Sequence, residues 1–414
     1  MNNLRLIELF AGYGSQAMAL KRAGIPFEHY KVIEFDKYAI KSYNAVHGTN
    51  FPPLDITEIT AQDLEIVDTD KYTYLMTYSF PCTDLSIAGK MQGMSKGSGT
   101  RSGLLWQVER ILNECSSLPQ FLLMENVPQV HGKKNINDFS DWISFLDSLG
   151  YISKWQDLNA KNYGVAQNRK RCFMISYLDK GYNFSFPDPL PLKTCVKDYL
   201  EEKVDDKYYL SESRVKALII HKERNKANGN GFGARFVTDN DIASSLTTSP
   251  DKSAGQYLLV KKDNDKLIKI GQIENGKNST YESTNRVYSP YGLCPTINTC
   301  SGGDRQPKVI IDDTQGFDGV RLYKDYAPSL RSSRYGLKTF CNMRIRRLTP
   351  LECFRLMGVT DEDAYKMLAA NSNSQCYKQA GNSIVVDVMT EIFKKLFIDQ
   401  SDQLKGQMSI FDFI

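Results

Sequence analysis

Leu4-Arg-Leu-Ile-Glu-Leu-Phe-Ala-Gly-Tyr-Gly14 joins an apolar segment to a glycine-rich turn near the start of the chain. Leu4 to Leu9 predicts a short strand, Gly12 and Gly14 predict a tight turn, and Ser15 to Arg22 predicts a helix. Short apolar strands and helical stretches continue to alternate through the first 180 residues. This alternation predicts an α/β fold with a doubly wound, mostly parallel sheet that helices cover on both faces.

An acidic residue ends the second apolar segment, Val32-Ile33. Glu34 lies twenty residues after Gly14, and a carboxylate at the end of such a strand can reach the hydroxyls of a ribose. The glycine turn and this acid together favour an adenosine-containing cofactor. Ala17 occupies the place of the third glycine of the dinucleotide pattern, where alanine is tolerated. The residues alone therefore leave both a dinucleotide and another adenosine cofactor open.

A cysteine follows the next strand-like run, Tyr72 to Ser79. Cys82 stands behind a proline in Phe80-Pro-Cys-Thr-Asp-Leu85, and a thiol held at a strand end can attack a substrate. By itself this residue would also fit a small buried hydrophobe, which is the commoner role of a cysteine inside cells. The motifs at the other strand ends favour the nucleophile.

Charged side chains mark two further strand ends. Glu125 ends an apolar segment in Met124-Glu-Asn-Val127, and Arg169 and Arg171 precede the segment Cys172 to Tyr177. The two arginines are two residues apart on extended backbone, so their side chains point the same way. A carboxyl group beside two guanidinium groups can serve acid–base chemistry. A structural ion pair and a solvated arginine face are the alternatives.

Together, and in this order, these motifs resemble those of the cytosine-5 DNA methyltransferase family. The resemblance extends to Arg347-Leu-Thr-Pro-Leu-Glu352, Arg355-Leu-Met-Gly358 and Gln379-Ala-Gly-Asn-Ser383, and it covers about residues 1–180 and 345–395. It implies a Rossmann-like S-adenosylmethionine-dependent methyltransferase core with a smaller β-rich target-recognition lobe.

The resemblance also implies how the chain is divided. The expected parts are a catalytic and cofactor-binding domain at 1–184, a target-recognition domain at 185–343, a return segment that completes the catalytic domain at 344–398, and a flexible tail at 399–414. In the return segment, Gln379 to Leu396 reads as one amphipathic helix that packs against the first domain.

The activity that the resemblance implies is transfer of a methyl group from S-adenosylmethionine to carbon 5 of cytosine in double-stranded DNA. Cys82 would add to carbon 6, and Glu125 would stabilise ring nitrogen 3. Of Arg169 and Arg171, one would orient Glu125, and the other would hold the base carbonyl and help to keep Cys82 ionised. Thr83 stands where the family commonly has glutamine, which leaves the positioning of DNA beside the cysteine open.

The residues that would contact the cofactor come from the strand ends, the glycine turn and the return segment. By resemblance they are Phe10, Ala11, Gly12, Gly14, Glu34, Asp55, Ile56, Leu104 and Asn382.

Ile87 to Gly103 is rich in glycine, serine and basic residues. A mobile loop of this kind could close over a nucleotide that is flipped out of the duplex, as chemistry on a stacked base requires. Lys90, Lys96 and Arg101 would then meet phosphates. A plain surface loop is the alternative.

The middle of the chain contains an internal repeat, led by Arg235-Phe236, Arg286-Val-Tyr288 and Arg321-Leu-Tyr323. Its short β-prone runs and turn residues predict a small β-rich lobe. Thr296-Ile297 resembles the Thr-Leu pair of the family's target-recognition region. Further candidates to contact DNA are the arginines suited to guanine, Arg305, Arg331 and Arg334.

Length and composition agree with an intracellular enzyme. A chain of 414 residues exceeds the size of one core, and a net charge of +4 is only mildly basic. The nine cysteines form no Cys-x-x-Cys pair and the four histidines are scattered, so neither a metal site nor a disulfide framework is expected. No long apolar run predicts export or a membrane span. The expected location is the cytoplasm, in association with the nucleoid.

The sequence also suggests two partners and leaves two other functions open. A restriction-modification or phage context would make a cognate restriction endonuclease the functional partner. Gln407-Met-Ser-Ile-Phe411 resembles the peptide with which bacterial proteins bind the replication sliding clamp, and packing of this tail on its own enzyme is the alternative. An RNA-modifying relative and a catalytically idle DNA-binding regulator are the other functions that the sequence leaves open.

Overall fold

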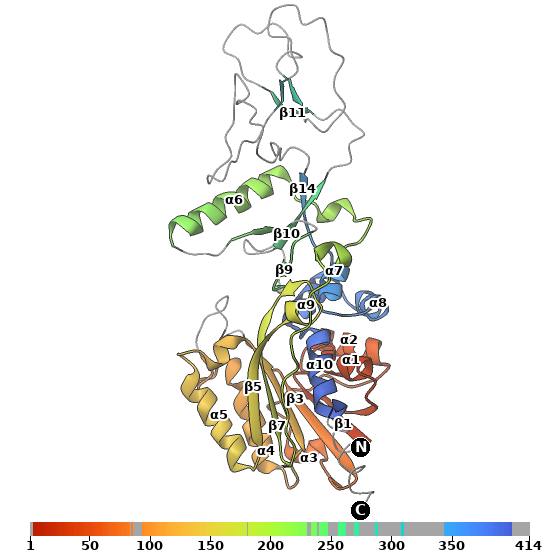
Figure 1. The fold of residues 1–414 in the computed structure, drawn as a ribbon, viewed down its shortest axis with the longest axis vertical. Helices are drawn as coiled ribbons and strands as arrows, with labels where there is room; N and C mark the ends of the chain where they lie inside the picture. The colour runs from red at the N-terminus through yellow and green to blue at the C-terminus, as the bar shows by residue number, and fades with distance from the viewer. Residues whose placement is uncertain are drawn as a thin grey trace, which may run out of the picture.

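The structure is a computed structural model, and it describes residues 3–82, 84–85, 93–179, 181–229, 233–237, 240–246, 256–261, 269–272, 286–288, 308–309 and 343–399. A large lobe, built on the main sheet, lies below a small lobe that contains α6, β8, β10 and β14 (Figure 1). None of the helices in these ranges has the length and apolarity that crossing a bilayer requires.

Six strands form the sheet of the large lobe. In spatial order they are β2 (Phe27–Ile33), β1 (Asn3–Leu9), β3 (Tyr72–Tyr78), β4 (Phe121–Asn126), β7 (Lys170–Tyr177) and β5 (Ile152–Asn159). The first four strands run parallel, whereas β7 is antiparallel to both β4 and β5. The predicted α/β fold with a mostly parallel sheet is therefore confirmed.

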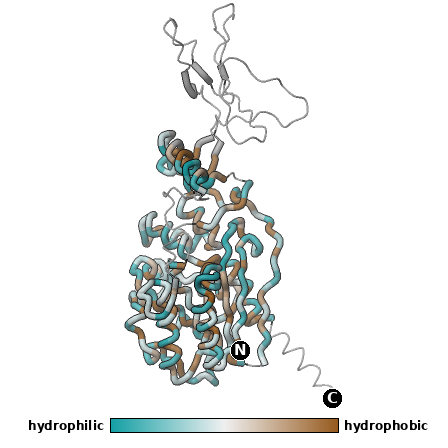
Figure 2. The backbone as a smooth tube through the Cα atoms, turned by 90° about the vertical axis from the view of Figure 1, so that its left-hand side faces the viewer, coloured by the Kyte–Doolittle hydropathy of each residue, from teal (hydrophilic) through white to brown (hydrophobic). Residues whose placement is uncertain are grey.

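Helices cover both faces of this sheet (Figure 1). One face carries α4 (Leu105–Glu114) and α5 (Ile136–Ser148), and the other carries α1 (Ser15–Arg22), α2 (Lys37–His47) and α10 (Val386–Phe397). Alternate strand residues point into two hydrophobic clusters, as Leu75 and Met76 of β3 do. In Figure 2 hydrophobic (brown) and hydrophilic (teal) stretches are mixed along the chain. The central strands β3 and β4 are buried along most of their length, as packing on both faces of the sheet requires.

The return segment forms four helices, and the last of them, α10, packs against α1. Its helices are α7 (Pro350–Leu356), α8 (Asp361–Ala370), α9 (Asn373–Asn382) and α10. The predicted single helix from Gln379 to Leu396 is wrong, because Ser383 is extended with φ −83° and ψ 172°. The carbonyl oxygen of Ser383 accepts a hydrogen bond from Arg169 Nη2 at 2.6 Å, so a side chain replaces the helical partner.

Two small sheets and one long helix are described in the small lobe. They are β14 (Met343–Arg347), β10 (Gln256–Lys261) and β8 (Arg235–Val237); β11 (Lys269–Gln272), β12 (Arg286–Tyr288) and β13 (Lys308–Val309); and α6 (Glu212–Ala227). Two leading segments of the predicted repeat are thus strands, β8 and β12, whereas residues 321–323 lie outside the described ranges. The 16-residue helix α6 is not predicted by the sequence.

A short parallel pair joins the lobes. Its strands are β6 (Gln167–Asn168) and β9 (Ala243–Ser244). The amide nitrogen of Leu246 donates to Gln167 Oε1 at 3.3 Å, and Arg169 Nη1 donates to the carbonyl oxygen of Leu246 at 3.5 Å. The segment that carries the two arginines is therefore attached to the first repeat unit.

The remaining described elements are α3 (Ala61–Leu64), η1 (Ser102–Leu104), η2 (Pro128–His131), η3 (Ala160–Asn162), η4 (Val196–Tyr199) and η5 (Asp206–Tyr208).

Candidate active site

The glycine turn after β1 adopts backbone angles that few residues tolerate. Phe10, Gly12 and Gly14 have φ of 59°, 58° and 82°, and a side chain in this region is strained at a cost of roughly 1–3 kcal/mol. A Cβ on Gly14 would lie 2.4 Å from His47 Nε2, so only glycine fits there. A Cβ on Gly12 would meet no protein atom within 4 Å. The peptide of Gly12 therefore borders open space in which a ligand can lie.

Glu34 fastens this turn to the end of β2. Its Oε2 accepts from the amide nitrogen of Gly12 at 3.0 Å, and its Oε1 accepts from that of Asp36 at 2.9 Å. Burial raises the pKa of Glu34, and these two backbone bonds lower it. The amide nitrogen of Leu54 donates to the carbonyl oxygen of Glu34 at 2.9 Å and so brings the following Asp55 to the same region. Each carboxylate oxygen can accept another bond, as from a ribose hydroxyl.

The other expected cofactor residues differ in exposure. Ala11 and Ile56 are buried, and Leu104 is half-buried in η1 against the same hydrophobic cluster as Phe10. Asp55 is exposed, and its Oδ1 accepts from the amide nitrogen and hydroxyl of Thr57 at 2.9 and 2.8 Å.

Asn382 is exposed at the last residue of α9. The next residue, Ser383, has its hydroxyl oxygen 2.5 Å from that of Ser15 at the start of α1. The structure thus brings the end of α9 to the glycine turn.

One aromatic residue at this place was missed by the sequence reasoning. Phe35 directly follows Glu34, and 67% of its surface is exposed. A phenyl ring with a free face can stack on a nucleobase. Its position next to Glu34, the acid expected to bind a ribose, is the signal in the sequence that could have identified it.

Cys82 follows β3 and is half-buried. Asn126, at the end of β4, donates from Nδ2 to the carbonyl oxygen of Phe80 at 3.0 Å and so holds the backbone before the cysteine. Burial raises the pKa of the Cys82 thiol, the positive charge of Arg171 is the largest influence that lowers it, and Glu125 raises it. The guanidinium of Arg171 therefore favours ionisation of the thiol, whereas burial opposes it. The positional role of Asn126 was not predicted.

Glu125 and Arg171 form a buried ion pair. Arg171 Nε lies 3.2 Å from Glu125 Oε1, and the two side chains are 16% and 8% exposed. Burial raises the pKa of Glu125, whereas Arg171 and then Arg169 lower it. A carboxyl group with a raised pKa can hold a proton and donate it to a substrate atom.

Arg169 is 3% exposed and contacts a different segment. Its Nη2 donates to the carbonyl oxygens of Gly381 and Ser383 at 3.0 and 2.6 Å, which flank Asn382. Burial and Arg171 lower the pKa of Arg169, and Glu125 raises it. Of the two arginines that could orient Glu125, the structure gives Arg171 that contact, and Arg169 ties the segment before β7 to the end of α9.

Few of the residues expected to contact DNA are described. Arg101 is exposed, and its backbone amide donates to Asp84 Oδ2 at 2.8 Å. The ammonium group of Lys96 pairs with Glu109 at 2.6 Å. The others lie outside the described residues, as does the tail 400–414: Lys90, Thr296, Ile297, Arg305, Arg331 and Arg334.

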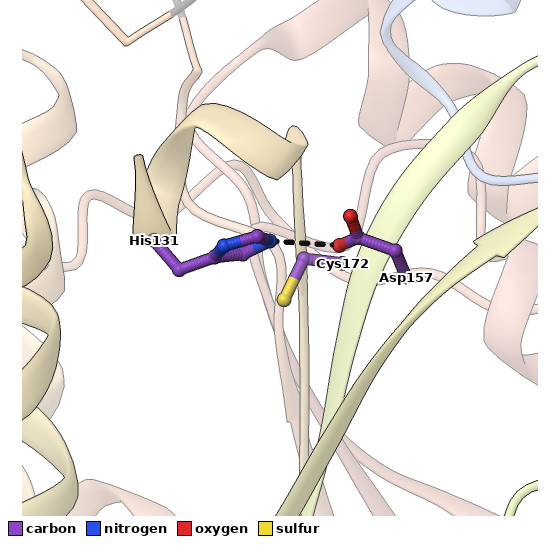
Figure 3. Close-up of side chains that lie close together, drawn as sticks. All are labelled: His131, Asp157 and Cys172. Atoms are coloured by element: carbon purple, nitrogen blue, oxygen red, sulfur yellow. Dashed lines mark hydrogen bonds and ion pairs between the residues drawn. The ribbon is translucent and has the colours of Figure 1, made fainter. Parts of the chain in front are cut away.

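His131, Asp157 and Cys172 offer three potential metal-ligand atoms within 4.8 Å of one another (Figure 3). Both carboxylate oxygens of Asp157 already have partners, His131 Nε2 at 2.9 Å and Lys170 Nζ at 3.0 Å. Burial raises the pKa of the Cys172 thiol well above its usual range. Because Cys172 alternates with Arg171 along β7, it points to the opposite face of the sheet from that residue. We interpret the cluster as an ion-pair network and assign no metal to it.

Comparison with known proteins gives a family match over almost the whole chain. The family described as C-5 cytosine-specific DNA methylase matches residues 4–398. A type II methyltransferase of Lactococcus lactis subsp. cremoris, M2.ScrFI, is 29% identical over 96% of this chain and 100% of its own length. The orphan methyltransferase M.SPBetaI of Bacillus phage SPbeta is 28% identical over 96% of this chain and 98% of its own.

Solved structures agree on the fold. The methyltransferase EhMeth of Entamoeba histolytica has a TM-score of 0.61 at 16% identity, covering 97% of this chain and 99% of its own. The S. pombe Dnmt2 methyltransferase has a TM-score of 0.59 at 19% identity, covering 95% and 98%. At these identities the likeness concerns the fold alone.

Proposed function

The chain belongs to the C-5 cytosine-specific DNA methylase family, and from this premise we propose that it methylates carbon 5 of cytosine through a covalent adduct on Cys82. The observation that carries this mechanism is the arrangement of the half-buried thiol beside the buried ion pair of Glu125 and Arg171. A nucleophile, an acid and an orienting cation are the groups that this reaction needs.

S-adenosylmethionine is the proposed cofactor, and the turn after β1 fits it. Gly12 leaves open space, Glu34 presents carboxylate oxygens for the ribose, and Phe35 offers an exposed ring for the adenine. When bound, S-adenosylmethionine supplies an electrophilic methyl group. Asp55 and Asn382 would add polar contacts at the rim, and Leu104 would add an apolar one.

The chemistry assigns a separate role to each catalytic residue. The thiol of Cys82 loses its proton to solvent, and its sulfur forms a bond to carbon 6 of cytosine. The electron pair of the double bond between carbons 5 and 6 then makes carbon 5 nucleophilic. Glu125 donates a proton or hydrogen bond to nitrogen 3, which its raised pKa supports. Arg171 orients Glu125 through their ion pair. After methylation, loss of the proton from carbon 5 expels the thiolate of Cys82 and restores the ring.

The target cytosine has to leave the duplex, because carbon 6 is not accessible within the base stack. We expect the small lobe to hold the duplex and to supply sequence specificity. Exposed basic side chains on α6 suit phosphate contacts. They are Arg214, Lys222, Arg224 and Lys226.

The biological setting is a separate part of the proposal. The names of the relatives include type II and orphan methyltransferases, so protection of DNA in a restriction-modification or phage context is proposed, with a cognate endonuclease in the first case. Binding of Gln407 to Phe411 to the sliding clamp is proposed from the peptide motif alone. Such tethering would raise the local concentration of the enzyme on newly replicated DNA.

Bisulfite sequencing of DNA from cells that express the chain tests the proposed function, because it reports both the modified atom and the sequence around it. We expect protected cytosines at one short sequence, and none with Cys82→Ser. Transfer RNA from the same cells serves as the comparison for an RNA-modifying activity. Absence of protected cytosines in both nucleic acids would favour a catalytically idle regulator.

A further inference from the structure

Ser102 is a buried hydroxyl whose bonds reach the backbone beside the nucleophile. It is 0% exposed and lies in η1. Its Oγ donates to the carbonyl oxygen of Pro81 at 2.7 Å and accepts from the amide nitrogen of Asp84 at 3.3 Å. The carbonyl of Pro81 and the amide nitrogen of Cys82 belong to one peptide plane. A fixed carbonyl oxygen of Pro81 therefore fixes the orientation of the peptide group that precedes the Cα of Cys82.

The side chain of Asp84 in turn binds the backbone at the start of η1. The residue is 7% exposed, and its Oδ2 accepts from the amide nitrogens of Arg101 and Ser102 at 2.8 and 3.3 Å. A carboxylate that accepts backbone amides makes charge-assisted hydrogen bonds, which are stronger than neutral ones. We call these four hydrogen bonds the Asp84–Ser102 clasp. It joins the segment of the nucleophile to the start of η1.

The backbone around Cys82 is then held at three successive carbonyl groups. Asn126 binds the carbonyl oxygen of Phe80, Ser102 binds that of Pro81, and the amide nitrogen of Leu85 donates to that of Cys82 at 3.1 Å. With the backbone held, rotation about χ1 is the main remaining freedom of the thiol. The position of the sulfur is therefore set largely by the clasp and by Asn126.

We propose that Ser102 and Asp84 are positioning residues that set the place of Cys82 relative to the cofactor pocket. This inference rests on the proposed function and deepens it. Leu104, the expected cofactor contact, lies in the same η1 segment as Ser102. The clasp thus links the residue that attacks carbon 6 to the wall of the pocket that supplies the methyl group. Both groups must meet one cytosine ring at the same time.

Positioning affects the chemical step more than binding. A displacement of about 1 Å at a reacting group can cost about 100-fold in rate. We expect Ser102→Ala to lower kcat for methylation by about 10-fold to 100-fold, while KM for DNA and KM for S-adenosylmethionine stay within about twofold of wild type. Ser102→Thr keeps the hydroxyl and should restore most of the lost kcat.

The matched control is Ser148→Ala, at the end of α5 and outside the loop and the segment of Cys82. Ser148 is exposed, and its hydroxyl donates to a backbone carbonyl oxygen, that of Phe145, at 2.7 Å. This variant should keep the wild-type kcat. Steady-state kinetics with the full-length proteins and a duplex that carries the recognised sequence would measure these values, and thermal unfolding would confirm that each variant is folded.

The outcomes separate this inference from the function on which it rests. Wild-type protein without activity on any DNA would overturn the proposed function. An active wild type with an equally active, folded Ser102→Ala would overturn the clasp alone, as would an equally low kcat in Ser102→Ala and Ser102→Thr. Should Ser102→Ala fail to fold, Ser102→Cys fills similar space with a weak donor, and it should show the same loss of kcat with unchanged KM. Wild-type kcat in that variant would contradict the clasp.

Discussion

Replacing Arg171 by alanine removes the partner of a buried carboxylate. Arg171 Nε lies 3.2 Å from Glu125 Oε1, and the side chain of Glu125 is 8% exposed. Loss of one member of a buried pair costs about 3–5 kcal/mol when the other stays charged. Glu125 can also avoid an unpaired buried charge, because it can take up a proton and become neutral. The loss of stability in Arg171→Ala should therefore depend on pH.

The direction follows from the pKa of Glu125. Burial raises this pKa in the folded protein, and Arg171 is the largest influence that lowers it, so the variant raises it further. An acid with a raised pKa binds more protons in the folded state than in the unfolded state, whose pKa is about 4.3. This difference in proton binding does not affect the free energy of unfolding below a pH of about 4.3, and it lowers that free energy increasingly as the pH rises. Arg171→Ala should be close to wild type near pH 5 and clearly less stable at pH 8.

The size of the effect can be converted into a melting temperature. Keeping a proton on Glu125 in the folded state costs about 1.4 kcal/mol per pH unit above the unfolded-state pKa of about 4.3. Between pH 5 and pH 8 this cost rises by about 4 kcal/mol, within the 3–5 kcal/mol expected for the broken pair. An unfolding entropy of about 2.1 cal/mol/K per residue, applied to 414 residues, gives a fall in Tm of about 3–6 °C at pH 8.

Calorimetry at pH 5 and pH 8 measures this effect in four proteins: wild type, Arg171→Ala, Glu125→Gln and the double variant. The double variant should regain most of the stability lost at pH 8 by Arg171→Ala, since glutamine carries no charge to bury. An equal fall in Tm at both pH values would refute the reasoning. So would a double variant as unstable at pH 8 as Arg171→Ala.

Other predictions concern the cofactor turn, the small lobe and the tail. Gly14→Ala should weaken S-adenosylmethionine binding at least about tenfold in calorimetric titration, because a Cβ there would lie 2.4 Å from His47 Nε2; wild-type affinity would contradict this account of the turn. Phe35→Ala should lose about 1–3 kcal/mol of cofactor affinity with Phe35→Trp close to wild type, and equal affinity of all three proteins would remove Phe35 from the site. Exchanging residues 185–343 for those of a relative should change the methylated sequence and leave cofactor binding intact; an unchanged sequence preference would show that the boundary is misplaced. A labelled peptide of residues 404–414 should bind purified sliding clamp and lose binding with Phe411→Ala, and negligible binding of both peptides would favour a tail that packs on its own enzyme.

The sequence predicts the large lobe well because local patterns dominate there. The helix bounds Ser15–Arg22 agree with the structure, and β3 ends within one residue of the predicted Ser79. Glycines with positive φ and acids at strand ends leave clear marks in a sequence, since few other residues can replace them.

Contacts between distant segments account for what the sequence did not predict. The break after α9 depends on the bond from Arg169 to the carbonyl of Ser383, which joins residues far apart in the chain. Ser102 and Asn126 were missed for the same reason, because their partners are backbone carbonyls rather than motif side chains. The helix α6 has little amphipathic pattern: in the part of it whose side chains are described, Leu218 is the one buried residue, so hydrophobic periodicity does not reveal it.

The most direct test of the catalytic account is covalent trapping. The protein is incubated with S-adenosylmethionine and a duplex that carries 5-fluorocytosine at the recognised position, and the adduct is located by mass spectrometry. Carbon 5 of the fluorinated base has no hydrogen that can be lost as a proton after methylation, so the thiolate cannot be expelled. The enzyme should therefore remain bound to carbon 6 through Cys82, and Cys82→Ser should form no adduct. An adduct on another residue, or one that persists in Cys82→Ser, would contradict the account.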